Sequence, residues 1–518
     1  MGLRRTLVPR TSDNELADMP NLLTTRRGRL LTFFLLYVSE GVPQGFTAVA
    51  VAYQMRKRGL SPAAVGAFVA TLYLPWAWKV LAGPVVDLVY SDRLGRRRAW
   101  IVGCQLMMAA TLLAAWPVDF AAHLGLFTAV IVLHNVFAAT QDVAIDALAV
   151  TVLPPAERGT ANGLMFAGAY AGNAVGGAGV LYLTPLVGFN QTFWMVAAAL
   201  LAITAGVSWR LREPGRGEGR AKGGGPASGW HGKTPCSPVS AAREEHGRTG
   251  RLPMPPGPAP DPRDPPDTPS PAAPLSFDHP SPVLPDRRAY LGTLFRSLFG
   301  TRAGLAGVAF ALLPTGAFAV SLSAGQNLPV EFGLSETNNA HLTLAGTVLS
   351  AAGCVAGGFL SDRLGRRRAV SAFVLLAAVP TLLLAWQLHR HGWVMPVDTA
   401  AAIRPAAPAA LVSAFVGATL AYAFVLGLIY GSRTAGFMDL SHPAVAGTQF
   451  TAYMAMMNLT LAYSSYWQGR AVERVGYPLM LAADAALGLA CLVPLALMRP
   501  RATEAAPASP ASGGRHAA

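Results

Sequence analysis

Charged residues are scarce in this chain of 518 residues. Asp, Glu, Lys and Arg make up 13% of it, hydrophobic residues make up 52%, and the mean hydropathy is +0.38. A soluble protein of ordinary composition carries about 25% charged residues, so a water-soluble fold is excluded for most of the chain. The composition predicts an all-α membrane protein that is embedded in the lipid bilayer, and we expect the bilayer to be one of its partners.

Cysteine is also rare, and nucleotide-binding motifs are missing. The chain has no C-x-x-C pair and no cysteine spacing typical of a metal site, so we expect no metal. It has no G-x-x-x-x-G-K-[ST] loop, so we expect no cofactor and no ATP-driven transport by this chain alone. The first apolar run is long enough to span and lacks a small-residue cleavage site, so we interpret it as a helix rather than a signal peptide. The four cysteines are Cys104, Cys236, Cys354 and Cys491.

Two further function classes lack their sequence features. A membrane-bound acyltransferase needs a His-Asp or His-Glu pair at the membrane interface, and the ten histidines form none, so we expect no enzyme and no catalytic residue. The net charge of +14 is compatible with nucleic-acid binding, but the basic residues cluster in short loops beside apolar runs, without interleaved aromatic residues. We therefore expect no nucleic acid as a partner.

Long apolar runs are what the chain has instead. A helix needs about 20 apolar residues to cross a bilayer. The sequence predicts twelve transmembrane helices, at 30–54, 62–88, 99–117, 123–150, 159–185, 191–209, 302–328, 339–361, 368–388, 409–432, 446–468 and 478–498.

One nine-residue string occurs twice, at Ser91–Ala99 and Ser361–Ala369, each time directly after an apolar run. An identity of this length is very improbable by chance, so the chain is interpreted as two related halves. The fold class that follows is two pseudo-symmetric halves of six helices each, a common architecture of transporters.

The distribution of arginine predicts the orientation in the membrane. Six arginines precede Leu30 and four occupy each repeat loop, which places these loops and both termini in the cytoplasm. The opposite loops at 118–122, 186–190 and 329–338 contain no Lys or Arg. Seven basic residues depart from the rule by falling on the outer side: Arg56, Lys57, Arg58, Arg390, Arg404, Arg470 and Arg474.

Composition divides the chain into five parts. A cytoplasmic tail (1–29) precedes the N-terminal six-helix half (30–210), and the C-terminal half (302–498) precedes a second cytoplasmic tail (499–518). The connecting segment, 211–301, is rich in Pro, Gly, Ser and Arg over 211–288, which predicts a disordered cytoplasmic linker. Apolar residues at helical spacing between Tyr290 and Phe299 predict an interfacial helix at its end. The linker is either a tether or a regulatory, partner-binding segment.

The second repeat loop carries a more specific pattern. Residues 358–367 fit G-x-x-x-D-R-x-G-R-R, so the transmembrane part resembles the major facilitator superfamily, which has this loop after the second span of each half. In the first half the pattern is stretched, which leaves open whether Asp87 or Asp92 is the gating aspartate. The resemblance implies a gating role for Asp87, Asp92, Arg93, Gly95, Arg96, Arg97, Asp362, Arg363, Gly365, Arg366 and Arg367.

Four segments of the first half narrow the resemblance. They are Pro75–Asp87, Gly95–Trp100, Ala139–Ala147 and Leu153–Gly159, and they are similar to segments of AmpG-type muropeptide permeases and acetyl-coenzyme A transporters. The resemblance implies a permease for a bulky polar metabolite, such as a muropeptide, a siderophore or a CoA ester.

The fourth predicted span contains two carboxylates on one face. Asp142 and Asp146 are four residues apart, next to Gln141, and lie about 12 Å and 6 Å from the cytoplasmic end at 1.5 Å per residue. Lys79, on the second span, lies at about the depth of Asp142, so we expect an ion pair between them. The pair is either a static salt bridge or a proton-responsive contact that breaks as a cavity opens.

Glu40 lies about 15 Å into the first span, near the bilayer centre. The Gly41-x-Pro43 pattern after it predicts a loosened helix with free backbone groups, and such breaks bind substrate and ions in transporters. We expect substrate or a proton at Glu40 and Gln44, with Gln326 opposite; the alternative is a buried, protonated glutamate with a fixed partner.

Other polar residues in the spans are weaker candidates for the same cavity. They are Arg433 and Gln449, together with Asn162, Asn173 and Asn458. The pattern Gly168-x-x-x-Gly172-x-x-x-Gly176 predicts close helix packing, whereas His134 and Asp484 are interpreted as packing or surface residues.

These observations predict a monomeric secondary transporter of the bacterial inner membrane. It works by alternating access of two halves, is driven by protons and takes up a small-molecule substrate. A proton-driven exporter and a membrane receptor that does not transport remain alternatives.

Overall fold

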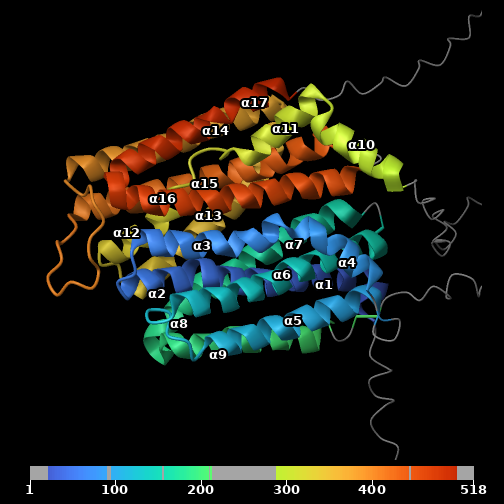
Figure 1. Ribbon diagram of the computed structural model, residues 1–518, viewed down its shortest axis with the longest axis horizontal. Coiled ribbons are helices and arrows are strands. Elements are labelled where there is room, and N and C mark those ends of the chain that lie inside the picture. The colour runs from blue at the N-terminus through green and yellow to red at the C-terminus, as the bar shows by residue number, and fades with distance from the viewer. Residues whose placement is uncertain are drawn as a thin grey trace, which may run out of the picture. The chain divides into compact units, whose positions relative to one another are not determined.

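The computed structural model describes residues 21–89, 91, 95–154, 157–208, 211–212, 287–442 and 445–498 (Figure 1). Most of both predicted tails, most of the linker, Asp92 and Arg93 lie outside these residues, and so does the side chain of Asp87. Within the described part, all regular structure is helical apart from one β-bridge between Ser91 and Gly95. The all-α class is confirmed.

Among the described residues, the first half contains nine α-helices, whose arrangement is drawn in Figure 1. The first predicted span consists of α1 (Arg26–Gly45), the π-helical segment η2 (Phe46–Val51) and α2 (Ala52–Lys57). The second consists of α3 (Pro62–Ala77), the short 3₁₀ turn η3 (Lys79–Leu81) and α4 (Ala82–Leu88). The rest of this half is α5 (Arg96–Ala115), α6 (Leu124–Val152), α7 (Arg158–Ala174), the π-helical segment η5 (Val175–Gly179), α8 (Val180–Val187) and α9 (Phe189–Gly206).

The second half follows the same plan. A separate helix, α10 (Arg287–Phe299), precedes it and exposes Leu291 and Phe295, as the expected interfacial helix requires. The remaining helices are α11 (Arg302–Leu312), α12 (Ser323–Glu331), α13 (Glu336–Leu364), α14 (Arg366–Arg390), α15 (Ala409–Leu440), α16 (Ala446–Ala490, with a kink at Gly476) and α17 (Leu492–Leu497).

Nine helices in the described residues are long and apolar enough to cross a membrane. The number is below twelve because the first predicted span, which contains the polar residues Glu40 and Gln44, is not among the nine, and the seventh is divided into α11 and α12. The last two predicted spans are joined into one helical run through the kink at Gly476. The count of twelve crossings remains a prediction.

Equivalent turns in the two halves have the same backbone conformation. Gly95 and Gly365, which stand in the two copies of the repeated string, have φ of 92° and 85°. Gly59 and Gly333, which precede the second span of each half, have φ of 89° and 72°. A left-handed φ strains residues that have a Cβ, so glycine is the expected residue at each turn. The pseudo-symmetry inferred from one repeat therefore extends to other turns.

Helix starts are also shared between the halves. Ser61 and Ser335 cap α3 and α13 by accepting a hydrogen bond from the backbone N–H three residues later. Thr25 and Thr301 cap α1 and α11 in the same way. Such caps satisfy backbone donors that the first turn of a helix leaves free.

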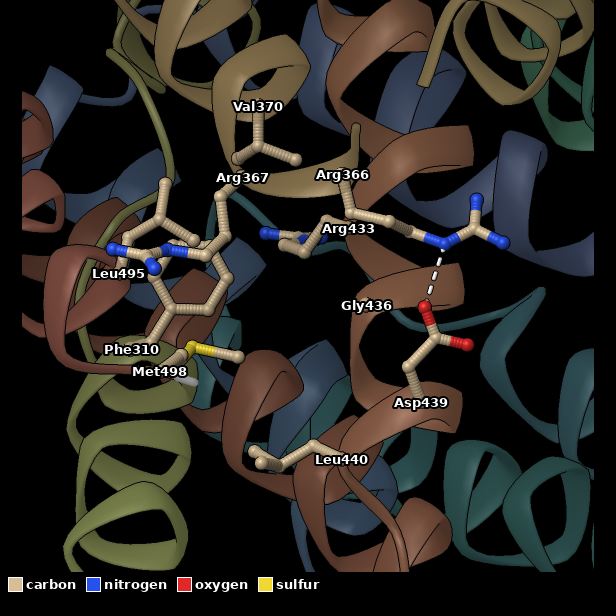
Figure 2. A pocket seen from close by; sticks show the side chains of 10 residues that line it. All are labelled: Phe310, Arg366, Arg367, Val370, Arg433, Gly436, Asp439, Leu440, Leu495 and Met498. Atoms are coloured by element: carbon tan, nitrogen blue, oxygen red, sulfur yellow. Dashed lines mark hydrogen bonds and ion pairs between the residues drawn. The ribbon is translucent and has the colours of Figure 1, made fainter. Parts of the chain in front are cut away.

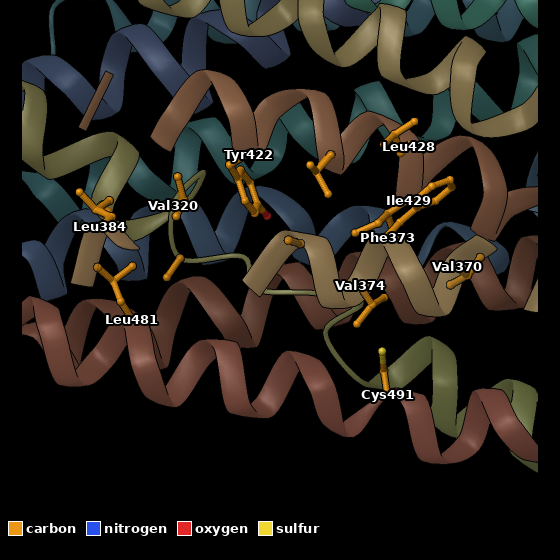
Figure 3. Packing of buried hydrophobic residues seen from close by; sticks show 14 of the residues in the cluster. Val320, Val370, Phe373, Val374, Leu384, Tyr422, Leu428, Ile429, Leu481 and Cys491 are labelled. Atoms are coloured by element: carbon orange, nitrogen blue, oxygen red, sulfur yellow. The ribbon is translucent and has the colours of Figure 1, made fainter. Parts of the chain in front are cut away.

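Each half has its own apolar interior. In the C-terminal half, Phe373, Val374, Tyr422 and Ile429 pack between α14 and α15, and Leu481 of α16 belongs to the same cluster (Figure 3). In the N-terminal half, α1 packs closely against α7 and η5, where a Cβ on Gly172 or Gly176 would meet the backbone of α1. The close approach predicted from the glycine repeat is confirmed.

One local expectation is wrong. α1 continues as a helix through Gly41 and Pro43, and a Cβ on Gly41 would meet the backbone of α7. Gly41 therefore permits close packing rather than a helix break. The interruption lies in the equivalent span of the other half, where residues 313–322 separate α11 from α12.

Candidate functional site: buried charges and a closed outer side

The predicted ion pair between Lys79 and Asp142 is present. Lys79 Nζ lies 2.7 Å from Asp142 Oδ2, and both side chains are largely shielded, with 12% and 5% of their surface exposed. Lys79 begins η3, where the backbone leaves the α-helical path after α3, and Asp142 lies on α6. The pair therefore links the second and fourth predicted spans.

Asp146 lies one turn further along α6, toward the predicted cytoplasmic end. Its carboxylate accepts a 2.7 Å hydrogen bond from the Tyr37 hydroxyl on α1. Asp146 is exposed, whereas Asp142 and Tyr37 are buried. The two carboxylates thus follow one another along α6, with Asp146 accessible to solvent and Asp142 shielded from it.

Glu40 completes this cluster from α1. It is buried and within electrostatic reach of Asp142, Lys79 and Asp146. Its Oε2 atom has no hydrogen-bond partner in the described part of the chain. Two ionised carboxylates beside one lysine would leave one buried negative charge without compensation. With one lysine beside Glu40 and Asp142, the arrangement is suited to hold a proton.

The other predicted cavity residues are not all in this cluster. Gln141 is fully buried and donates to Ser39 Oγ, inside the N-terminal half. Gln44 lies one turn after Glu40 on α1, and Gln326 lies on α12 with a buried Oε1 that lacks a partner among the described residues. Gln449 accepts from the His442 backbone N–H and donates to the Tyr453 hydroxyl, so it braces the connection between α15 and α16.

The C-terminal half reaches the cluster through α15. Tyr430 lies within electrostatic reach of Glu40, Lys79 and Arg433. Its ring also contacts Phe166 of α7, with ring centroids 6.0 Å apart. Arg433 itself lines a separate cavity with Arg366 and Arg367.

The second copy of the repeated loop is held by ion pairs of Arg366. In the second copy, Gly365 ends α13, and Arg366 pairs with Asp362 at 2.8 Å and with Asp439 of α15 at 2.7 Å. The neighbouring Arg363 stacks on Phe359. These contacts connect the loop to α15, and its gating role stays a prediction.

In the first copy, Gly95 precedes α5, which begins at Arg96. Arg97 donates a 2.9 Å hydrogen bond to the Val86 carbonyl of α4. Whether Asp87 or Asp92 is the gating aspartate stays open, because the side chain of Asp87 and the whole of Asp92 lie outside the described part.

An ion pair that the sequence did not predict joins the two halves at the ends that the arginine distribution predicts to be outer. Arg56 of α2 lies 2.6 Å from Glu331 of α12, and both side chains are almost completely buried. The same guanidinium donates to the Val397 carbonyl and the Thr399 hydroxyl. Arg56 was an exception to the arginine rule, and its buried partner gives this arginine a role other than setting the predicted orientation.

Glu331 is held from several elements at once. The Tyr477 hydroxyl, just after the kink in α16, donates to Oε1 at 2.6 Å, and Trp393 Nε1 donates to Oε2 at 3.3 Å. A buried carboxylate needs hydrogen-bond donors and a counter-charge, and this network supplies both. The network fixes α2 of one half against α12, α16 and the 391–408 loop of the other.

Further contacts between the halves surround this pair. Gln54 and Lys57 of α2 both bind the Glu336 carboxylate, at 2.6 Å and 2.8 Å. The backbone N–H of Ala63 donates to Glu473, and the Tyr53 hydroxyl donates to the Leu334 carbonyl. Gly66 and Gly469 allow α3 and α16 to approach within backbone contact nearby. The predicted outer side is therefore closed in this structure.

Asp484, interpreted from sequence as a packing or surface residue, is fully buried. It accepts hydrogen bonds from the Ala319 backbone N–H at 2.8 Å and from Gln468 Nε2 at 2.7 Å. Ala319 lies in the break between α11 and α12, so Asp484 satisfies a backbone donor that the break leaves free. His134 is a packing residue, buried against Thr111 and the Met108 carbonyl.

The chain matches the family model described as Major Facilitator Superfamily over residues 30–465. It is 28% identical over 178 residues to the putative transporter AmpG 4 of Rickettsia conorii, covering 34% of this chain and 42% of that protein. It is 25% identical over 174 residues to the anhydromuropeptide permease of Escherichia coli K12, covering 33% and 35%. The alignments thus span less than half of these relatives' own length.

Among solved structures, the fold is similar to that of the E. coli xylose transporter XylE in an inward-open conformation, with a TM-score of 0.59 at 12% identity. The comparison covers 92% of this chain and 97% of XylE. A second similar structure is that of the nucleoside transporter NupG, with a TM-score of 0.58, 12% identity and coverage of 91% and 98%. At these identities the similarity concerns the fold alone.

Proposed function

The chain belongs to the Major Facilitator Superfamily, and on that premise we propose that it is a proton-coupled transporter that takes up a bulky polar metabolite by alternating access of its two halves. That it is a membrane transporter of small molecules rather than an enzyme follows from the family. The substrate, the proton coupling and the direction are the proposed parts.

The observation that carries the coupling is the cluster of Glu40, Lys79, Asp142 and Asp146. Two buried carboxyl groups face one lysine, so if both were ionised an uncompensated negative charge would lie inside the bundle. An unpaired charge at this depth costs several kcal/mol. Binding one proton removes that cost, and exposed Asp146 offers a first acceptor on the predicted cytoplasmic side.

The same contacts provide a way for a proton to act on the helices. Lys79 joins α6 to the second predicted span, and Tyr37 joins α6 to the first. When Asp142 is protonated, it loses the charge that holds Lys79, and the link between these spans weakens. We propose that this change accompanies the switch between outward-open and inward-open states.

Uptake requires that the outer side open, and the closed side found here is held in part by polar contacts, beside the apolar Val330 and Ala340 of the second half, which pack against the first. Arg56, Glu331 and Glu336 are groups that water can solvate when the halves separate. The relatives named AmpG transporter and anhydromuropeptide permease favour a muropeptide-like substrate, with siderophores and CoA esters as the other candidates.

We propose that the substrate binds beside Glu40 and Gln44 on one side and Gln326 on the other. Gln326 has an unsatisfied buried Oε1 in the described part, and it lies just after the break in the seventh predicted span. Such a break leaves backbone groups available to a ligand. The transporter is proposed to act as a monomer in a bacterial inner membrane with both termini in the cytoplasm.

The test is uptake into liposomes that contain the purified protein. A muropeptide, a siderophore and a CoA ester are each offered with an acidic exterior, with and without a protonophore. We expect one of them to accumulate only while the gradient lasts, and Glu40→Gln to raise its KM or abolish the gradient dependence. Substrate accumulation that does not depend on the pH gradient would contradict proton coupling. Binding of a substrate to the protein without its entry into the liposomes would indicate a receptor.

A further inference from the structure

A small cavity lies at the predicted cytoplasmic end of the C-terminal half (Figure 2). Its volume is about 50 Å³, and its lining includes Arg366, Arg367 and Arg433, with Asp439 as its one acidic residue. Apolar side chains such as Phe310 and Leu495 form much of the remaining wall. Three cations and one anion thus share one small space.

The acidic residue is already engaged. Arg366 Nε donates to Asp439 Oδ2 at 2.7 Å (Figure 2). The same guanidinium pairs with Asp362 at 2.8 Å. Both carboxylates are therefore engaged with Arg366. They leave Arg367 and Arg433 without a carboxylate partner in the described residues of this cavity.

Both remaining arginines have an unsatisfied donor. Arg433 is 7% exposed, and its Nε–H has no hydrogen-bond partner in the described part of the chain. Arg367 donates to the Ala496 carbonyl, but its own buried Nε–H also lacks a partner there. A buried guanidinium is always charged, and a shielded charge without a counter-ion is strongly unfavourable.

The backbone adds to the positive potential. α14 starts at Arg366 and runs for 25 residues, so its N-terminal end, with its free N–H groups, lies at the cavity. Helix N-termini favour anions because of the unsatisfied N–H groups and the helix dipole. Arginine forks match the oxygen geometry of phosphate.

We propose that this cavity binds a phosphate group through Arg367, Arg433 and the N-terminus of α14. The apolar wall and the neighbouring Val493 and Leu497, which are 68% and 63% exposed, favour a phospholipid headgroup as its source. Basic pockets between transmembrane helices on the cytoplasmic side are suited to anionic headgroups. This site is separate from the proton cluster, and it does not depend on the identity of the transported substrate.

The experiment has one arm for each source of phosphate. In the first, the protein is released from nanodiscs of phosphatidylcholine with or without phosphatidylglycerol, and native mass spectrometry counts the lipids that remain bound. In the second, delipidated protein is heated in inorganic phosphate or in chloride of equal ionic strength. Arg367→Gln and Arg433→Gln are compared with Arg368→Gln, which removes the same charge from an exposed neighbour outside the cavity.

We expect wild type and Arg368→Gln to retain one phosphatidylglycerol, and Arg367→Gln and Arg433→Gln to retain it about tenfold less, as loss of a charge-assisted hydrogen bond implies. Stabilisation by inorganic phosphate without lipid retention would support the same site with a free phosphate as its ligand. Arg433→Met tests folding separately: in delipidated protein it should raise Tm, because it removes an unpaired buried charge. Equal retention by all variants, together with no effect of phosphate on Tm, would overturn the proposal.

Discussion

Lys79 and Asp142 were expected to form an ion pair because they lie at about the same predicted depth in the bilayer. Position along a helix gives depth at about 1.5 Å per residue, and a charge inside the bilayer needs a partner, so the sequence alone was enough to predict this pair. The partner of Arg56 was not predictable in this way. Glu331 lies 275 residues away in the other half, and only the exception of Arg56 to the arginine rule signalled that it had a special environment.

The residue-scale prediction for the first pair is a double-mutant cycle. Lys79→Ala and Asp142→Ala each leave one charge without its ion-pair partner, which typically costs about 3–5 kcal/mol, whereas the double variant removes both. We therefore expect the double variant to have a higher Tm than either single variant, measured by thermal unfolding in detergent. Additive losses would mean that the pair is not energetically coupled.

A second residue-scale prediction concerns Arg29 and Glu157, which join the start of α1 to the loop before α7. Glu157 accepts two hydrogen bonds from Arg29, at 2.7 Å and 3.0 Å, and these hold the pKa of the Glu157 carboxyl below its ordinary value. The pair therefore contributes fully above the ordinary glutamate pKa of about 4.3 and loses its contribution as the pH falls through the lowered value.

The substitution Glu157→Gln should accordingly lower Tm slightly at pH 7 and make no difference in strong acid. Thermal unfolding of both proteins over a pH series measures this. A Tm difference that grows toward low pH would contradict the assignment.

At the scale of helices, the halves resemble each other in turns more than in spans. The nine-residue repeat was visible in the sequence, but the shorter Gly-Leu-Ser at 59–61 and 333–335 became meaningful only once both copies were seen to make the same turn and helix cap. The expected break at Gly41 was wrong because a glycine next to a proline is equally compatible with close helix packing. Sequence pattern alone does not separate these two uses of glycine.

Packing of α1 against α7 and η5 leads to the prediction at this scale. A Cβ on Gly176 would overlap the Val42 carbonyl oxygen, so Gly176→Ala must push these helices apart. Gly163, on the same span, has open space around the corresponding position and serves as the control. We expect Gly176→Ala to lower Tm by several degrees and Gly163→Ala to leave it unchanged or slightly raised, because alanine favours helix.

At the scale of the whole molecule, family membership and two related halves followed from the sequence, but the closed side did not. Inward-open and outward-open states of one chain differ by only a few kcal/mol, so no local pattern decides between them. The closed outer side was recognisable only from contacts that join distant segments, such as Lys57 with Glu336.

Arg56 allows this closure to be tested. Arg56→Gln leaves Glu331 buried without its cation, which should shift the protein toward an outward-open state by more than tenfold. Arg58→Gln is the matched control, since Arg58 pairs with Asp119 within its own half and is exposed. Distances between spin labels at Asn190 and Arg390, at the outer ends of α9 and α14, should lengthen in the first variant alone. Unchanged distances in Arg56→Gln would contradict the role of the pair in closing the outer side.

The most direct measurement of proton coupling is made on Asp142→Asn in liposomes. Asparagine keeps the size of the side chain but cannot exchange a proton, so the variant should lose accumulation driven by a pH gradient while it still exchanges substrate across the membrane in counterflow. Both assays use the substrate identified in the uptake panel and equal amounts of inserted protein. Accumulation at the wild-type level by Asp142→Asn would contradict the account.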